Sequence, residues 1–141
     1  GLLHDFGKIM FAHFLPNDFK QALQMARKER LPLYETEQRI FTSDHAQIGS
    51  LLCKKWNLPP HLTACIRNHH CHDREESLII DAVSAADQIS TELNIGFGGE
   101  NMIDELPDGI SRRFGTNVHA VINSLGNIHE ETKKAMIFIQ K

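Results

Sequence analysis

The chain has 141 residues, of which 41% are apolar and 23% charged, and its formal net charge is -3. This length suits one domain with a real core, and the composition argues against disorder. Without a basic surplus, we do not expect the chain to wrap along nucleic acid, and no apolar run is long enough to cross a membrane. Three cysteines without CxxC spacing predict reduced thiols and, with no signal-peptide pattern, a cytoplasmic location.

Helical periodicity runs through the first half of the chain. The pair Asn17-Asp18 predicts the start of a helix that ends at Leu31-Pro32. A short charged helix is expected over 34–41, and Ser43 is the predicted N-cap of the next. Pro60 then opens a helix that ends at His69-His70. Two apolar faces are predicted for these helices, Phe19, Ala22, Leu23 and Ala26 in the first, then Ile48, Leu51, Leu52 and Trp56 after Ser43.

The second half is predicted to be helical as well. Ser77 begins a long apolar helix, in which Asp81 is assigned to the solvent face. The stretch 71–76 is predicted to be a loop, 94–101 a Gly-rich loop, and 110–114 a short helix. One or two helices follow over 117–140. The buried side of the long helix is expected to contain Ile79, Ile80, Val83, Ala86 and Ile89.

With strand signals almost absent, these patterns predict an all-α fold. We expect a single domain over 1–141, with a core over 1–93, the Gly-rich loop over 94–101, and C-terminal helices over 102–141.

Several polar residues stand in apolar surroundings. An uncompensated charge in such surroundings is costly, and a metal ion would compensate it. Helices packed side by side can direct such side chains into one pocket, where mixed nitrogen and oxygen ligands hold one or two divalent ions. Lys8 is placed to contact a phosphate oxygen as a point charge. The candidate ligands are His4, Asp5, His45, His69, His70 and Asp87.

Structural explanations compete with this interpretation. His4-Asp5 could be a buried ion pair, and His69-His70 could interact with the dipole of its own helix C-terminus. Trp56 and the phenylalanines are expected in the core. The remaining histidines are interpreted as caps or surface residues: His13, His61, His72, His119 and His129.

The chain resembles the HD superfamily of metal-dependent phosphohydrolases, and most closely its HDOD branch of bacterial signalling domains. The segments that carry the resemblance are Gly1-Leu2-Leu3-His4-Asp5-Phe6-Gly7-Lys8, Asp44-His45-Ala46-Gln47-Ile48-Gly49, Trp56-Asn57-Leu58-Pro59, Ile66-Arg67-Asn68-His69-His70 and Ala86-Asp87.

This resemblance implies an HD-like helical bundle with a divalent metal pocket for Fe, Mn, Zn, Ni or Mg. It implies His4 and Asp5 as the metal-binding doublet and Asp87 as the distal carboxylate. His45, His69 and His70 match positions that hold a second ion in the catalytic HD-GYP relatives. Lys8 matches a lysine near the phosphate, so Lys8 and Asp5 are the candidate catalytic residues.

Two features depart from the family pattern. The superfamily's first metal-binding histidine lies upstream of the doublet, and no counterpart precedes His4, so we expect the chain to be the C-terminal part of a domain whose N-terminal helices are missing. No Gly-Tyr-Pro motif follows His69-His70, which argues against cyclic di-GMP hydrolysis.

Three functions follow from these features. The first is a regulatory output domain of a longer signalling protein, such as a response regulator with a receiver-type domain upstream and a signalling protein, or a second copy of the chain, as partner. The second is an active phosphohydrolase acting on a phosphodiester or nucleotide. The third is a purely structural bundle whose histidines are caps. Whether the chain is an enzyme stays open at this stage.

Overall fold

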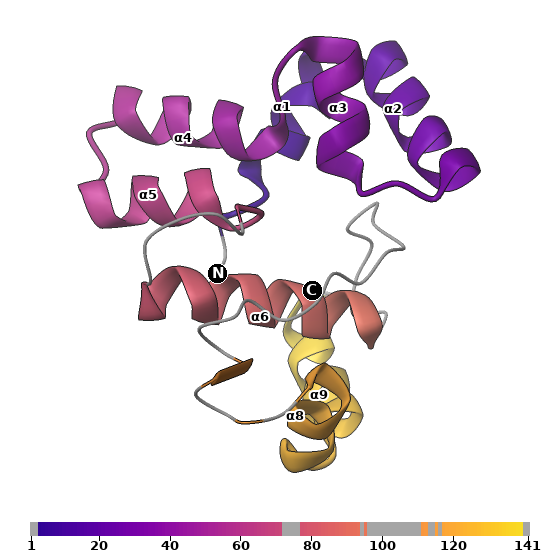
Figure 1. Cartoon of the computed structure of the whole chain (residues 1–141), viewed down its shortest axis with the longest axis vertical. Helices are drawn as coiled ribbons and strands as arrows, with labels where there is room; N and C mark the ends of the chain where they lie inside the picture. The colour runs from indigo at the N-terminus through magenta and orange to yellow at the C-terminus, as the bar shows by residue number, and fades with distance from the viewer. Residues whose placement is uncertain are drawn as a thin grey trace.

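The computed structural model describes residues 3–71, 77–93, 95, 111–112, 115 and 117–139, without the side chains of 118, 129 and 135–139. Within these ranges all regular structure is helical, which confirms the predicted all-α fold (Figure 1). No helix there is long and apolar enough to cross a bilayer. The helices are α1 (Phe6–Phe14), α2 (Pro16–Glu29), α3 (Leu33–Phe41), α4 (His45–Lys55), α5 (Pro60–Asn68), α6 (Leu78–Glu92), α8 (Val118–Ser124) and α9 (Ile128–Ile139).

The first three helices pack around small residues of α2. Ala22 and Ala26 are buried on its apolar face, as the periodicity predicts, and Leu33 at the start of α3 is fully buried against them. Phe11 of α1 stacks on Phe41 of α3, with ring centroids 4.2 Å apart. Small side chains on α2 let α3 approach closely, and the stacked rings hold α1 beside both.

Two helix starts differ from the sequence prediction. Helix α2 begins at Pro16, ahead of Asn17-Asp18, because proline suits the first turn of a helix, where its missing N–H is not needed. The N-cap of α4 is Asp44 and not Ser43: its extended backbone lets Oδ1 accept a hydrogen bond from the Gln47 amide at 2.8 Å.

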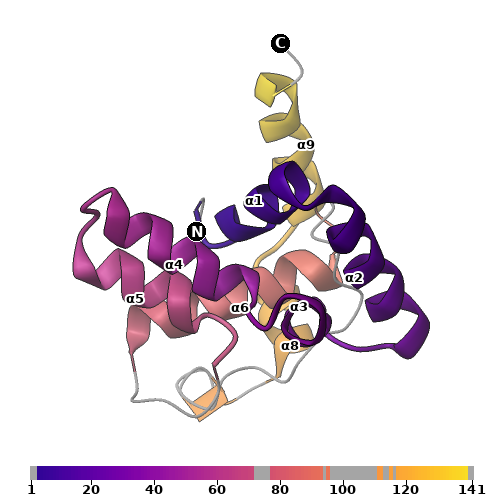
Figure 2. The ribbon, with the colours of Figure 1, turned by 90° about the horizontal axis from the view of Figure 1, so that it is seen from above.

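The buried face of α4 also differs from the prediction. Leu51 is 57% exposed and Trp56 50% exposed, so neither lies in the core. The Trp56 ring instead meets the ring of Phe6 edge-on at 5.3 Å. Helix α4 turns its small residues inward because α1 and α5 pack closely against it, as Figures 1 and 2 show for α5. The buried residues of α4 are His45, Ala46, Gly49, Ser50 and Cys53.

Helix α6 lies between α5 and α8 and is therefore covered on two sides (Figure 1). Asp81 is only 2% exposed, so its assignment to the solvent face is wrong. Ile80 is buried as predicted, whereas Ile79 is 55% exposed and Ala86 is exposed. On the side toward α8, Ala85 packs against Val121.

One or two helices are predicted over 117–140, and the structure has two there, α8 and α9. Residues 111–112 are helical, and the rest of the predicted short helix over 110–114 lies outside the described residues. The same holds for the loop predicted over 71–76 apart from residue 71, for the Gly-rich loop apart from residue 95, and for the side chain of His129.

Gly7 sets the distance between α1 and α4. A Cβ added there would lie 2.7 Å from the His45 Cα and still closer to the His45 carbonyl oxygen. Gly49 of α4 faces the same contact, and a Cβ there would lie 3.4 Å from the Gly7 nitrogen. The two backbones thus approach more closely than any residue with a side chain would permit at position 7.

Gly7→Ala should therefore force α1 and α4 apart and lower the free energy of unfolding by more than about 3 kcal/mol. Gly49→Ala is the matched control, because its added Cβ would meet the movable Ile66 side chain at 3.1 Å. The gain in helix propensity should keep that variant within about 1 kcal/mol of the wild type. Urea unfolding followed by circular dichroism measures both, and equal effects would contradict the backbone clash.

Candidate metal centre

Asp5 lies at the centre of a cluster of polar side chains. It is the residue immediately before α1, so its carboxylate is held at the start of that helix. Its Oδ2 lies 3.0 Å from the Lys8 Nζ and 3.4 Å from the His4 Nε2. Its Oδ1 lies 3.3 Å from the His45 Nε2 and 3.8 Å from the His69 Nε2. The two oxygens therefore face two different sets of side chains.

These sets form two groups of candidate metal ligands that share Asp5. In the first, the His4 Nε2 lies 3.0 Å from the Asp87 Oδ1 of α6. In the second, the His45 Nε2 lies 3.0 Å from the His70 Nε2. Within each group, one ligand atom per residue can be chosen so that all lie within 4.8 Å of one another. The groups are His4, Asp5 and Asp87, and Asp5, His45, His69 and His70, so the structure brings together all six residues singled out in the sequence.

Glu37 belongs to this site, although the sequence analysis did not identify it. Its side chain is fully buried, and its Oε2 accepts hydrogen bonds from the His45 Nδ1 at 2.6 Å and from the His45 backbone N at 2.8 Å. The signal was present in the sequence, because Glu37 follows Leu33 by four residues and so shares the buried face of α3. A carboxylate on an apolar helix face is the same pattern that pointed to Asp87.

Hydrogen bonds on the far sides of two imidazoles set their tautomers. The His45 Nδ1 carries the proton that it donates to Glu37, and the His69 Nδ1 donates to the Ile66 carbonyl oxygen at 2.7 Å. In the neutral rings, both Nε2 atoms then present lone pairs toward Asp5. The His69 backbone is held in turn by α6, where the Ser84 Oγ donates to its carbonyl oxygen at 2.6 Å.

A cation would fit this arrangement. The His45 and His69 Nε2 lone pairs and the Asp5 Oδ1 converge, and only the His45 Nε2 accepts a hydrogen bond, from the His70 Nε2 at 3.0 Å. The Asp5 Oδ1 and the His69 Nε2 are buried and have no hydrogen-bond partner. Buried polar atoms of this kind are costly unless something satisfies them, and a divalent ion accepts both nitrogen and carboxylate ligands.

The surroundings keep three of the candidate ligands, His69, His70 and Asp87, in forms that can bind a metal. Burial, followed by the nearby His45, lowers the pKa of His69 to about 4. Burial and the neighbouring His69 also lower the pKa of His70 strongly. Burial raises the pKa of Asp87, but the hydrogen bond and charge of His4 outweigh it and hold that pKa below its usual value. Neutral imidazoles and an ionised carboxylate are the ligand forms that a divalent ion requires.

Lys8 is close to the cluster but is already engaged. It is 9% exposed, and its Nζ donates a hydrogen bond to the Asp5 Oδ2 at 3.0 Å. The ammonium group therefore offsets part of the carboxylate charge in the first ligand group.

Three of the histidines predicted to lie outside the site are exposed, which confirms their assignment to the surface: His13, His61 and His119. His72 lies outside the described residues.

Comparisons with known proteins agree with this architecture. The family model of the HDOD domain matches residues 1–72. A protein of Treponema pallidum (strain Nichols), described as an uncharacterized protein, is 30% identical over 70 residues, which are 50% of this chain and 14% of that protein. The crystal structure of an HDOD domain protein with unknown function from Geobacter sulfurreducens matches with a TM-score of 0.72 and 26% identity, over 95% of this chain and 50% of that one. The chain thus spans half or less of the length of these two proteins.

Glu37→Gln should weaken the binding of a divalent ion such as Mn²⁺ about tenfold or more, because the amide polarises and orients the His45 ring less strongly than the carboxylate. Glu35→Gln makes the same charge change two residues earlier on α3, on another face of the helix, and should leave the affinity unchanged. Calorimetric titration with Mn²⁺ measures both. Equal affinities for all three proteins would show that Glu37 does not act through His45.

The buried imidazoles also predict a pH dependence of stability for the metal-free protein. Below pH 6.5 the unfolded chain gains a proton at His69, whereas the folded chain does not until about pH 4. The free energy of unfolding should therefore fall with decreasing pH in this window, by up to about 1.4 kcal/mol per pH unit from this residue.

Urea unfolding in EDTA at several pH values between 7 and 4.5 tests this dependence. His69→Gln should have a shallower pH dependence than the wild type, while the exposed His61→Gln should retain the wild-type dependence. A variant at position 69 with the wild-type slope would contradict the prediction.

Proposed function

The chain belongs to the HDOD domain family, as its sequence resemblance predicted, and from this premise we propose that it is a regulatory output domain of a longer bacterial signalling protein. In this proposal its metal centre binds a phosphate-containing ligand. The observation that carries the proposal is the sharing of Asp5 between two ligand groups. One carboxylate between two such groups is a suitable bridge for a pair of divalent ions.

The proposed ligand sets follow from the geometry. One ion would be held by His4, Asp5 and Asp87, and a second by Asp5 with His45, His69 and His70. Imidazole and carboxylate ligands together are compatible with Fe, Mn, Zn, Ni or Mg. When bound, such ions supply positive charge that attracts and polarises a phosphoryl oxygen.

The residues of the chain itself would orient and retain the phosphate group. The Lys8 ammonium lies beside Asp5, so a phosphate at the centre could contact this cation while it remains paired with the carboxylate. Glu37 and the Ile66 carbonyl hold two imidazoles with their Nε2 atoms directed at the centre. The side chains therefore require little rearrangement on binding, which reduces its entropic cost.

Hydrolysis of a phosphodiester or nucleotide is the second candidate function. It is favoured by the convergence of the other five candidate ligands and Lys8 on the Asp5 carboxylate, since binding alone requires fewer buried polar groups. In this function Asp5 and Lys8 would be the catalytic residues. The lack of a Gly-Tyr-Pro motif after His70 argues against cyclic di-GMP as the substrate.

The proposed partner is a receiver-type domain or another signalling protein. This proposal is supported by the lengths of the two relatives. The chain spans only 14% of the Treponema protein and 50% of the Geobacter protein. A second copy of the chain is the alternative partner.

Metal analysis of the purified protein tests the centre. After loading with Mn²⁺ we expect two ions per chain. Asp5→Asn should lower the affinity for both by at least tenfold, whereas Asp87→Asn should weaken one and spare the other. The exposed Asp18→Asn, on α2, controls for the loss of a charge. Fewer than one tightly bound ion per wild-type chain would contradict the proposed centre.

The same samples separate the two candidate functions. Hydrolysis of bis(p-nitrophenyl) phosphate by the Mn²⁺- or Fe²⁺-loaded protein, lost in Asp5→Asn, would favour the phosphohydrolase. Full metal loading with no hydrolysis would favour the regulatory domain.

A further inference from the structure

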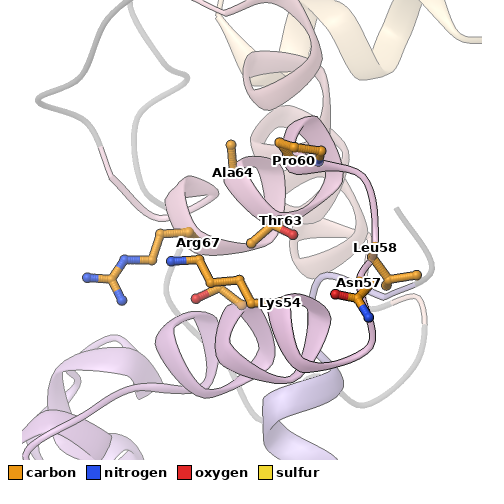
Figure 3. A pocket seen from close by; sticks show the side chains of 8 residues that line it. Lys54, Asn57, Leu58, Pro60, Thr63, Ala64 and Arg67 are labelled. Carbon is orange, nitrogen blue, oxygen red and sulfur yellow. The ribbon is translucent and has the colours of Figure 1, made fainter.

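A cavity of about 710 Å³ lies between α4 and α5, apart from the cluster around Asp5. Lys54 of α4 and Arg67 of α5 line it from facing helices, as Figure 3 shows. The Lys54 side chain extends from its helix toward Arg67, so the two cationic groups lie on the same side of the cavity. The other polar side chains of the lining are those of Ser50, Asn57 and Thr63.

No carboxylate among the described residues compensates the charge of this cavity. The part of its lining that the structure describes contains two cations, although the chain as a whole has a net charge of -3. Neither Lys54 nor Arg67 forms an ion pair with any residue in the described ranges. A guanidinium binds two phosphate oxygens through its paired N–H groups, and an ammonium adds a second charge without a fixed direction. The chemistry of the cavity therefore suits a phosphate group.

Arg67 connects this cavity to the metal centre. It also lines a second cavity, of about 300 Å³, whose lining includes Tyr34 and His70. His70 is a candidate ligand of the centre, and its ring stacks on that of Tyr34 with centroids 4.8 Å apart. Because Arg67 precedes His70 by only three residues, it stands between the two cavities.

We propose that Lys54 and Arg67 form a second anion subsite, which holds one phosphate of a ligand whose other phosphate lies at the metal centre. The ligand class is a nucleotide or dinucleotide with at least two separated phosphate groups. The pairing of the two sites rests on the proposed function, whereas phosphate binding by the subsite does not.

Calorimetric titration with inorganic pyrophosphate in EDTA tests the subsite without metal. Lys54→Gln and Arg67→Gln should each weaken binding about tenfold or more, as expected for loss of a charge-assisted contact. Lys55→Gln is the matched control, because it removes the same charge from the neighbouring exposed residue, which does not line the cavity. It should stay within about twofold of the wild type. No binding by the wild type, or equal weakening by Lys55→Gln, would overturn the subsite.

The Mn²⁺-loaded protein tests the pairing with the metal centre. The adenine dinucleotide pApA, which has a terminal phosphate, should bind about tenfold more tightly than ApA, which lacks it. This preference should disappear in Arg67→Gln, whose metal content should equal that of the wild type. An equal preference in wild type and variant would overturn the pairing. Failure of the wild type to bind Mn²⁺, with pyrophosphate binding intact, would instead refute the proposed function and leave the subsite standing.

Discussion

The close approach of α1 to α4 at Gly7 is the constraint on which the rest of the site depends. Asp5 is held just before the first turn of α1, and His45 is the first residue of α4. A Cβ at position 7 would overlap the His45 backbone, so only glycine allows these two helix starts to meet. The same contact brings the Asp5 Oδ1 to 3.3 Å from the His45 Nε2. Glycine at position 7 therefore allows both the close packing of α1 against α4 and the approach of Asp5 to His45.

Residues around the Asp5 cluster hold its histidines in position through hydrogen bonds. Glu37 fixes His45, the Ile66 carbonyl fixes His69, and Ser84 holds the backbone of His69 from α6. The contacts of Glu37 and the Ile66 carbonyl satisfy the Nδ1 atoms of the two rings. The Nε2 atoms are then directed at the Asp5 Oδ1. Such an arrangement destabilises the metal-free fold, and it gives a bound cation preformed ligands.

The α4–α5 pair connects this centre with the cationic cavity. The start of α4 contributes His45 and the end of α5 leads into His69 and His70, so these residues lie at one end of the pair. Lys54, Asn57 and Pro60 lie toward the other end, where the chain turns from one helix into the next. Because Arg67 lines both cavities, one helical hairpin carries the candidate metal ligands at one end and the two cations of the larger cavity beside them.

The sequence by itself determined the all-α fold, most of the helices and six polar residues that converge at the site, because helical periodicity and the cost of a polar group in an apolar stretch are local properties. Only the tertiary structure decided which faces of α4 and α6 are buried. Trp56 and Leu51 are exposed and Asp81 is buried, since α4 turns small residues toward its neighbours and α6 is covered on two sides. It also decided the role of Glu37, because the partner of a buried carboxylate depends on which helix packs opposite it. The sharing of Asp5 between two ligand groups also depends on the tertiary structure. It requires residues as far apart in the sequence as His4 and Asp87 to meet at the Asp5 carboxylate.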